Sequence, residues 1–462
     1  MKRIILFFVT LSVGFTAQAM ITDDTDLTRS NHANGVSGTV ASTPRYTFNS
    51  TTGELTLNWG EFNQYNMWGD DVINTAVKTV IATSEVSFTY DCSQLFYNFS
   101  HCESMDLSRV NTSEMTNAKR MFRACSSLTS LDLADWNTTN ITDMYEMFCD
   151  CDNLVSLNLS GWNTANVTDM SFMFDGCSRL ISLDLTGWNT SNVIDMYYMF
   201  NGCKALNSLD ISGWNTASVT TMVQMFYGCS GLTSLDISGW NTGHVMSMGG
   251  MFSGCSGLTS LDLSSWNTAN VWGMQNMFSG CSGLTSLDLS SWNTANVWSL
   301  EYMFSGCSGL KSLDISGWNT ANVMYMNNMF ADCSSLTTIY AGEDWSTELV
   351  FGEWSEGMFT SCTALVGGMG TVFDKTHTDK AYAHIDGGSD NPGYFTAKST
   401  NLRGDVNGDN NVNISDVTAL IDYLLRDNAS SINLDNADVN QDESISISDV
   451  TILINYLLRE HW

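Results

Sequence analysis

Residues 258–281 read LTSLDLSSWNTANVWGMQNMFSGC, and close variants of this stretch recur every 26 residues. Nine cysteines keep the 26-residue step: Cys125, Cys151, Cys177, Cys203, Cys229, Cys255, Cys281, Cys307 and Cys333. Eight tryptophans keep it as well, from Trp136 to Trp318, each at the start of a Trp-Asn-Thr triplet. A period that holds over so many copies without an insertion is typical of a solenoid in which each copy forms one coil.

The apolar residues of one copy change their spacing along the coil. Leu258, Leu261 and Leu263 fit the pattern L-x-x-L-x-L, which predicts a short strand. The Trp-Asn-Thr triplet predicts a turn. After it the apolar residues fall three and four apart, which predicts a short amphipathic helix or a helical turn: Val271, Met274, Met277, Phe278 and Cys281. A single coil has too little core to fold alone, so stacking must supply the rest.

The consensus M-F-x-x-C-x-x-L-x-x-L-D-L-S-x-W-N-T-x-x-V-x-x-M resembles the repeat of the BspA-like leucine-rich repeat surface proteins of bacteria, over about residues 95–365. The resemblance implies a leucine-rich-repeat-like solenoid of short parallel strands and helical turns, and a role in adhesion or binding. We expect a strand-rich N-terminal cap over 20–94, the solenoid over 95–366 and a closing cap over 367–398.

The N-terminus and the charge of the chain bear on its location. Lys2 and Arg3, an apolar run over residues 4–15 and Ala17-Gln18-Ala19 predict a secretory signal over 1–19. No later apolar run reaches the ~18–20 residues that cross a bilayer, so no direct membrane span is expected. The net charge of −31 disfavours nucleic acid and anionic membranes as partners. It suits cations, basic protein patches or neutral glycans. The predicted location is extracellular or at the cell surface.

The cysteine and tryptophan columns each allow two interpretations. Equivalent residues of adjacent coils should lie about 4.8 Å apart, within disulfide range, but their parallel side chains have poor geometry for a bridge. We therefore predict reduced, buried core cysteines, with Cys92–Cys102 as the better candidate for a disulfide. The tryptophans could form a sugar-binding platform, but residues in step with the leucines are more often core, and the core is our prediction.

An outward position between the inward leucines carries six consecutive carboxylates: Asp184, Asp210, Asp236, Asp262, Asp288 and Asp314. We call these the aspartate row. Charges ~5 Å apart repel by roughly 0.8 kcal/mol in water and ~3 kcal/mol at an effective dielectric of 20. One hypothesis is that Ser and Thr of the neighbouring Leu-Thr-Ser-Leu segments offset this, with some raised pKa values. The other is that the row recruits cations or a basic ligand.

A second position opens the expected helical turn, where Thr142, Thr168 and Thr220 could act as caps. Four successive coils replace the hydroxyl by large apolar groups, which we call the apolar stripe: Met246, Trp272, Trp298 and Met324. An exposed stripe of this kind often marks a contact site. The alternative is that Asn270, Asn296 and Asn322 take over the capping while the stripe packs on itself.

The pattern D-x-N-x-D-x₆-D occurs twice after the polar linker 399–403. It supplies oxygen ligands at loop positions 1, 3, 5 and 12, as calcium requires, with backbone carbonyls at position 7. The first loop offers Asp405, Asn407, Asp409, Asn411 and Asp416, and the second offers Asp438, Asn440, Asp442, Ser444 and Asp449. Position 6, where the chain turns sharply, is Asn410 in one loop and Glu443 in the other. Because Glu tolerates a left-handed backbone less well than Asn, the second Ca2+ site should be weaker.

Two such loops in tandem, each running into an amphipathic helix, resemble a type I dockerin over residues 404–462. The resemblance implies a cohesin-type protein domain as partner, read by Ile414 and Ser415 after the first loop and by Ile447 and Ser448 after the second. The alternative is that calcium serves only to fold a small terminal domain.

These features favour a secreted binding protein, adhesin-like, whose solenoid displays a surface for an unidentified extracellular protein or glycan. The alternative is a non-catalytic component of a polysaccharide-processing cohesin-dockerin assembly. An enzyme is the least favoured class. The six histidines are scattered, and the sequence has no nucleophile elbow or zinc motif.

Overall fold

The computed structural model describes residues 45–66, 71–398, 403–408, 412–426, 432–442 and 444–459. The predicted signal over 1–19 lies outside these ranges, as do Asp409, Asn410, Asn411 and Glu443 of the two loops. None of the helices in the described ranges has both the length and the apolar character to cross a membrane.

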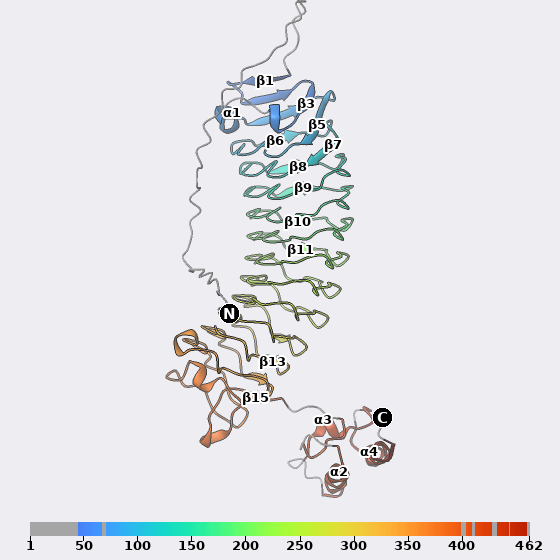
Figure 1. Ribbon diagram of the computed structural model, residues 1–462, viewed down its shortest axis with the longest axis vertical. Helices are drawn as coiled ribbons and strands as arrows, with labels where there is room; N and C mark the ends of the chain where they lie inside the picture. Colours follow the sequence, from blue (N-terminus) through green and yellow to red (C-terminus); the bar gives the residue numbers. More distant parts are fainter. Residues whose placement is uncertain are drawn as a thin grey trace, which may run out of the picture. The chain divides into compact units, whose positions relative to one another are not determined.

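The repeats stack as parallel coils with their strands on one face, which we call the strand face (Figure 1). Its strands are β8 (Ser130–Asp132), β9 (Ser156–Asn158), β10 (Ser182–Leu183), β11 (Ser208–Leu209), β12 (Ser286–Asp288), β13 (Ser312–Ile315) and β14 (Thr338–Ala341). Ser130 pairs with Ser156, and Ser286 pairs with Ser312. The pairing register therefore equals the sequence period, and the predicted fold of one coil per 26 residues is confirmed.

The N-terminal end of the stack is built from two sheets and short helical segments. Its elements are β1 (Tyr46–Asn49), β2 (Glu54–Leu57), β3 (Gly60–Phe62), η1 (Gln64–Asn66), α1 (Asp71–Ala76), β4 (Thr79–Ala82), β5 (Val86–Asp91), β6 (Ser104–Asp106) and β7 (Asn111–Asn117). β1 is antiparallel to β2, and the other pairings of these strands are parallel. Parallel stacking thus begins at β2. Where the cap ends and the repeats begin stays a prediction.

The C-terminal end of the stack carries η2 (Gly352–Trp354), η3 (Lys380–Tyr382), η4 (Gly388–Asp390) and β15 (Thr396–Ala397), which pairs with β14. Asp386 holds this end together. Its carboxylate is buried and accepts hydrogen bonds from the backbone N–H groups of Met369, Thr371 and Gly388 and from the Thr371 hydroxyl. Burial opposes ionisation, but these hydrogen bonds outweigh it and hold the pKa of Asp386 well below its usual value.

A separate helical module follows, with α2 (Ile414–Arg426), α3 (Leu434–Ala437) and α4 (Ile447–Arg459). It has its own small core, formed by Val406, Val417, Leu420, Ala437, Val439, Val450 and Leu453. Helices α2 and α4 contact each other across this core. A core of this size supports few elements, so the module depends on further stabilisation.

The segment that follows each Trp-Asn-Thr triplet forms turns, and residues 95–366 contain no α-helix; the short 3-10 helix η2 lies beyond the last triplet. The Met147 amide donates to the Met144 carbonyl within its coil at 3.2 Å, whereas the Phe148 amide donates to Met173 of the next coil at 2.9 Å. Because every second amide is directed at a neighbouring coil, the i→i−4 ladder of a helix does not form. Left-handed residues such as Phe172 (φ 57°) and Tyr198 (φ 59°) make this alternation possible.

The tryptophan column is core, as predicted. All eight side chains, from Trp136 to Trp318, are buried. Six of the indole N–H groups donate to a carbonyl of the preceding coil, as Trp162 does to Leu133 at 2.9 Å. The Trp188 and Trp214 indoles have no hydrogen-bond partner. Burial of all eight rings inside the stack thus accounts for the Trp column without a sugar ligand.

The cysteine column is reduced and buried, also as predicted. Each thiol donates to the Phe carbonyl of the preceding coil, as Cys203 does to Phe174 at 3.2 Å. The predicted Cys92–Cys102 disulfide is wrong. Both residues are free, and their thiols donate instead to Phe62 at 3.6 Å and Ser104 at 3.3 Å. Burial raises the pKa of each of these two thiols to about 12, so both stay protonated at neutral pH.

We therefore expect all 13 cysteines to resist a thiol-specific alkylating reagent in the native protein, because burial and raised pKa values suppress the reactive thiolate. After denaturation without a reductant, mass spectrometry should count 13 alkylated thiols. A count two lower, with the deficit at Cys92 and Cys102, would show that the disulfide exists.

Candidate functional site

The aspartate row lies along the strand face, each side chain fixed by the same local turn. The Asp236 Oδ1 atom accepts the Ser238 backbone N–H at 3.2 Å and the Ser238 hydroxyl at 2.8 Å. The other five members make the same two contacts with the residue two positions later. The partners are therefore not the Ser and Thr of the Leu-Thr-Ser-Leu segments, and that prediction is wrong.

The expected rise in pKa is also wrong where a shift is resolved in the row. The hydroxyl and backbone N–H of Thr186 lower the pKa of Asp184, and those of Ser264 lower the pKa of Asp262. Hydrogen bonds from Ser290, with Lys398 nearby, lower the pKa of Asp288. These carboxylates are ionised at neutral pH.

One cation of the chain itself lies on the row. Lys398, just after β15, forms an ion pair between its Nζ atom and Asp314 Oδ2, the oxygen that the local turn leaves free. Among the described residues, no other Lys or Arg pairs with the row. The row can therefore accept an ammonium group without disturbing the bonds that hold its carboxylates.

The apolar stripe is partly exposed. Met246 and Trp272 expose 49% and 44% of their surface, whereas Trp298 and Met324 are half-buried. The aromatic rings of neighbouring coils contact one another along the stack. The ring centroids of Trp272 and Trp298 are 6.1 Å apart, and those of Trp298 and Tyr325 are 5.5 Å apart. The stripe thus packs partly on itself and still presents apolar surface.

The expected capping at this position does not occur. The Thr142 hydroxyl donates to the Thr116 carbonyl of the preceding coil at 3.3 Å, and Asn270 Nδ2 donates to Gly243 at 2.7 Å. Asn296 and Asn322 make the same contact as Asn270. These side chains join coils, because the turn after each triplet is not a helix and has no N-terminus to cap.

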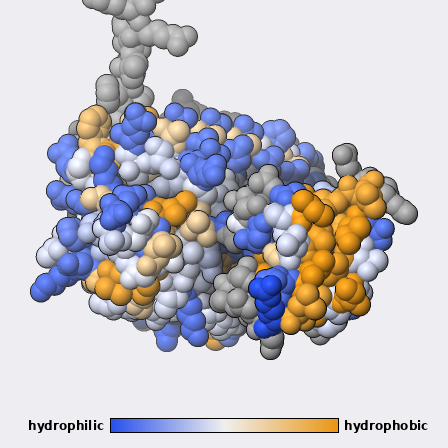
Figure 2. Space-filling view, turned by 90° about the horizontal axis from the view of Figure 1, so that it is seen from below, coloured by the Kyte–Doolittle hydropathy of each residue, from blue (hydrophilic) through white to orange (hydrophobic). Residues whose placement is uncertain are grey.

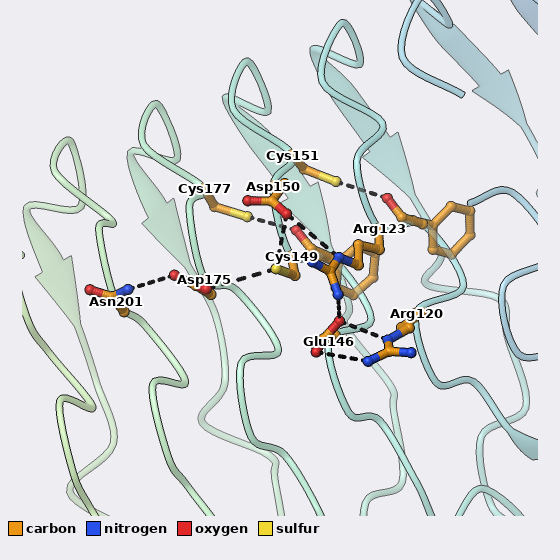
Figure 3. Close-up of polar contacts among 11 residues, drawn as sticks. Arg120, Arg123, Glu146, Cys149, Asp150, Cys151, Asp175, Cys177 and Asn201 are labelled. Atoms are coloured by element: carbon orange, nitrogen blue, oxygen red, sulfur yellow. Dashed lines mark hydrogen bonds and ion pairs between the residues drawn. The ribbon is translucent and has the colours of Figure 1, made fainter. Parts of the chain in front are cut away.

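Sequence reasoning missed a polar cluster at the turns of four coils (Figure 3). Arg120 and Arg123 both pair with the buried Glu146. Burial opposes the ionisation of Glu146, but the hydrogen bonds and charges of its partners lower its pKa. Next to them the Cys149 thiol lies 3.4 Å from Asp150 Oδ2 and 3.8 Å from Asp175 Oδ2. Burial is the main cause that raises the pKa of Asp175 to about 6.

The signal for this cluster was in the sequence. Cys149 is a cysteine outside the 26-residue register, and arginines are rare in this acidic chain. The close arginine–glutamate contacts indicate that the cluster ties neighbouring coils together. Within the described residues, no three His, Cys, Asp or Glu side chains converge as metal ligands.

The two predicted calcium loops share one arrangement in the described residues. Asp416, at position 12, is fully buried, and its two oxygens accept the backbone N–H groups of Asn407 and Asn413 at 3.0 and 2.9 Å. Asp449 does the same with Asn440 and Ser446, both at 2.9 Å. Each position-12 carboxylate therefore draws the two ends of its loop together.

These residues fit a calcium ion. Asp416 and Asp449 are fully buried, and neither forms an ion pair with a described Lys, Arg or His. A buried carboxylate needs a compensating charge, and carboxylate and amide oxygens are the donors that Ca2+ prefers. Asp405, Asn407 and Asp416 would hold an ion in the first loop, and Asp438, Asn440, Asp442 and Asp449 in the second. The remaining predicted ligands are Asp409 and Asn411, which lie outside the described residues, and Ser444.

The first turns of α2 and α4 are equivalent and expose apolar side chains. Ile414 is 70% exposed and Ile447 is 71% exposed. Near the other ends of the helices Leu425 and Leu458 are also exposed, and Figure 2 shows hydrophobic surface gathered on this module. Ser415 and Ser448 are held by their loops, since their Oγ atoms accept Asn407 Nδ2 at 2.6 Å and Asn440 Nδ2 at 2.9 Å. The contact role of these residues stays a prediction.

Comparison with known families agrees with this geometry. Residues 71–182, 150–260 and 256–371 match the family described as "Mycoplasma protein of unknown function, DUF285". The chain belongs to the DUF285 family. Beyond the DUF285 repeats, residues 403–458 match the type I dockerin domain. The predicted resemblance to a BspA-like repeat protein with a dockerin-like module is thereby confirmed. No curated protein matches the chain.

Solved leucine-rich repeat structures are similar to parts of this DUF285 protein. A leucine-rich repeat protein from Bacteroides ovatus is 17% identical, with 70% of this chain and 91% of that chain covered and a TM-score of 0.38. An internalin from Listeria monocytogenes is 14% identical, with 64% and 82% covered and a TM-score of 0.24. A leucine-rich repeat protein from Eubacterium ventriosum is 15% identical, with 64% and 81% covered and a TM-score of 0.23.

Removal of calcium should unfold α2 and α4 of this DUF285 protein and leave the solenoid folded, because Asp416 and Asp449 then lose their compensating charge. Calcium at 100 times its Kd should stabilise the module by about 2.7 kcal/mol. Thermal melts followed by circular dichroism at 222 nm, with and without EDTA, measure this. Asp416→Ala should remove most of the effect, whereas Asp422→Ala, which removes a partly exposed carboxylate paired with Arg426 on the same helix, should not. An EDTA-insensitive helical signal would contradict the calcium sites.

Proposed function

We propose that the chain is a secreted, non-catalytic binding protein. Its C-terminal module docks to a cohesin-type domain, and its solenoid presents a surface to an extracellular protein or glycan. Leucine-rich-repeat-like solenoids and dockerins are non-catalytic kinds of domain, and a dockerin implies a cohesin-associated, protein-binding role. Secretion rests on the predicted signal over 1–19 and is supported by the kinds of domain present.

The observation that carries the proposal is the duplicated loop-helix unit. Asp416 and Asp449 organise two equivalent loops, and each loop leads into a helix that begins with an exposed isoleucine. Exposed apolar side chains on a rigid helix are typical protein contacts. Since the two units are nearly identical, either Ile414 with Ser415 or Ile447 with Ser448 would face the partner.

The solenoid supplies the second half of the proposal. The apolar stripe offers Met246 and Trp272 as exposed anchors, and aromatic residues are enriched at interface hot spots. The aspartate row offers carboxylates on the strand face, with Lys398 as an example of a cation that it accepts. Four successive coils each add one residue to both features, as expected for an extended binding surface.

A pull-down with the full chain should separate the two halves. An immobilised type I cohesin domain should capture the chain in calcium and lose it in EGTA, because the chelator removes the ions that order α2 and α4. Extracellular partners held by the solenoid should remain bound in EGTA. Cohesin capture that persists in the chelator would speak against calcium-dependent docking.

The apolar stripe can be tested with substitutions that restore the residue of other coils. Trp272→Thr with Trp298→Thr should reduce capture of stripe-bound partners at least 10-fold, because two hot-spot anchors are lost, while the circular dichroism spectrum is unchanged. Ile194→Thr is the matched control, since Ile194 occupies the same position and is 49% exposed. Equal capture by the double variant and the control would remove the stripe from the proposal.

A further inference from the structure

The parallel ladder of the strand face is broken in the middle of the solenoid. On the N-terminal side, the amides of Val155, Ile181 and Asn207 each donate to the carbonyl 26 residues earlier. On the C-terminal side, Lys311 donates to Thr285 and Thr337 to Lys311. In the coils between these two regions, no described backbone N–H or C=O group of residues 233–236 or 259–262 forms a hydrogen bond with a neighbouring coil. No strand is assigned in the described residues between the end of β11 and the start of β12.

The break is confined to the strand face. On the opposite side of the same coils, the amides of Phe200, Phe226 and Phe252 donate to the next coil at 2.9 Å without exception. The buried Phe rings behind them stay stacked, with centroids 5.5 to 5.8 Å apart. The coils are therefore firmly joined along one side and open along the other.

The charge of the aspartate row opposes pairing of its strands. Asp184 and Asp210 meet no cation among the described residues, and there the pairing of β10 with β11 stops at Leu183↔Leu209, one residue before the two aspartates. Within the row, backbone pairing runs through the aspartates only at Asp288↔Asp314, where Lys398 neutralises Asp314. Nearer the N-terminus, outside the row, Asp132 of β8 pairs with the uncharged Asn158 of β9. The open junctions carry Asp210, Asp236 and Asp262, whose side chains meet no cation among the described residues. Repulsion of roughly 0.8 to 3 kcal/mol per neighbouring pair competes with hydrogen bonds of about 1 kcal/mol each.

Shallow hollows lie along this part of the strand face. One hollow of about 590 Å³ begins over the paired strands β10 and β11, at Ser182, Asp184, Ser208 and Asp210, and extends to Ser234 and Asp236 of the first open coil. A second of about 330 Å³ continues it past Ser260 and Asp262. Residues 233–236 and 259–262, part of which line these hollows, carry backbone N–H and C=O groups that the broken ladder leaves without a partner from the next coil. Backbone groups of this kind are strong acceptors and donors for a ligand.

The chemistry of the row favours an organic cation over a metal ion. Ca2+ needs six to eight converging oxygens, but each Oδ1 atom here is held by its own Ser or Thr. Lys398 shows that a single ammonium group is satisfied by the free Oδ2. A guanidinium group has five donors and can reach a carboxylate and an unpaired carbonyl together.

We propose that the break in the strand ladder, over residues 207–285, is the binding site for an extended peptide segment rich in arginine or lysine. The inference rests on the proposed function of the solenoid as a display surface and names the partner of its strand face. The peptide supplies the positive charge that the open coils lack, as Lys398 does at Asp314. Side chains on one face of an extended peptide recur every ~6.6 Å, so an octapeptide covers several coils.

The test uses the full chain and a fluorescein-labelled octapeptide of alternating arginine and glycine, followed by fluorescence anisotropy at 0.15 M NaCl. Asp236→Asn with Asp262→Asn removes two carboxylates of the break and should weaken binding at least 10-fold. Asp106→Asn with Asp132→Asn is the control, because it makes the same charge change where the strands are paired, and it should weaken binding less than 3-fold.

Hydrogen exchange read by mass spectrometry gives an independent result. The amides of 233–236 and 259–262 should exchange at least 10-fold faster than those of 130–132 in the free chain, and the peptide should slow them. Three outcomes would each overturn the inference. The first is slow amide exchange of 233–236 and 259–262 in the free chain, and the second is an equal loss of peptide binding in both double variants. The third is that 1 mM CaCl2 alone protects these amides as well as the peptide does. If the peptide does not bind while the apolar stripe still captures partners, the proposed function is supported and this inference is wrong.

Discussion

The hydrogen bond between equivalent positions of adjacent coils is the interaction on which the rest of this structure depends. It appears as strand pairs such as Ser130↔Ser156, as the Phe amide to the next coil and as the Cys203 thiol to Phe174. Each coil satisfies its buried polar groups through its neighbours, because its own turns leave every second amide free. A coil separated from the stack would leave these groups unpaired, so local folding and stacking are one event.

Most of the fold could be predicted from the sequence because the period is strict. An inward Leu, a Trp-Asn-Thr triplet and a Met-Phe pair at fixed offsets determine the coil, and the Trp and Cys columns follow from it. The structure has turns where a short helix was expected. Apolar residues spaced three and four apart also occur in turns whose alternate backbone amides donate to a neighbouring coil, so the spacing does not distinguish the two. The left-handed backbone of Phe172 and Tyr198 leaves no signal in residue type.

The candidate sites were predicted less evenly. The two loops of the terminal module were found from their spacing, and the structure places Asp416 and Asp449 at the closure of each loop. The hydroxyl partners of the aspartate row were misassigned because the chain turns directly after each aspartate, which brings the N–H and hydroxyl of the residue two positions later onto Oδ1, as Ser238 shows at Asp236. The cluster of Arg123, Glu146 and Cys149 was missed because it depends on contacts between coils at positions where the repeat varies.

The strict register has a consequence for how such a chain can change in length. Whole units of 26 residues, such as 258–283, can be gained or lost while all columns stay continuous. Shorter insertions are tolerated at the C-terminal end of the stack, where Cys362 follows Cys333 by 29 residues, yet Phe359 still stacks on Phe330 at 5.5 Å and the Cys362 thiol donates to the Phe330 carbonyl. Growth by a whole unit adds one layer about 4.8 Å thick and one further member to every column.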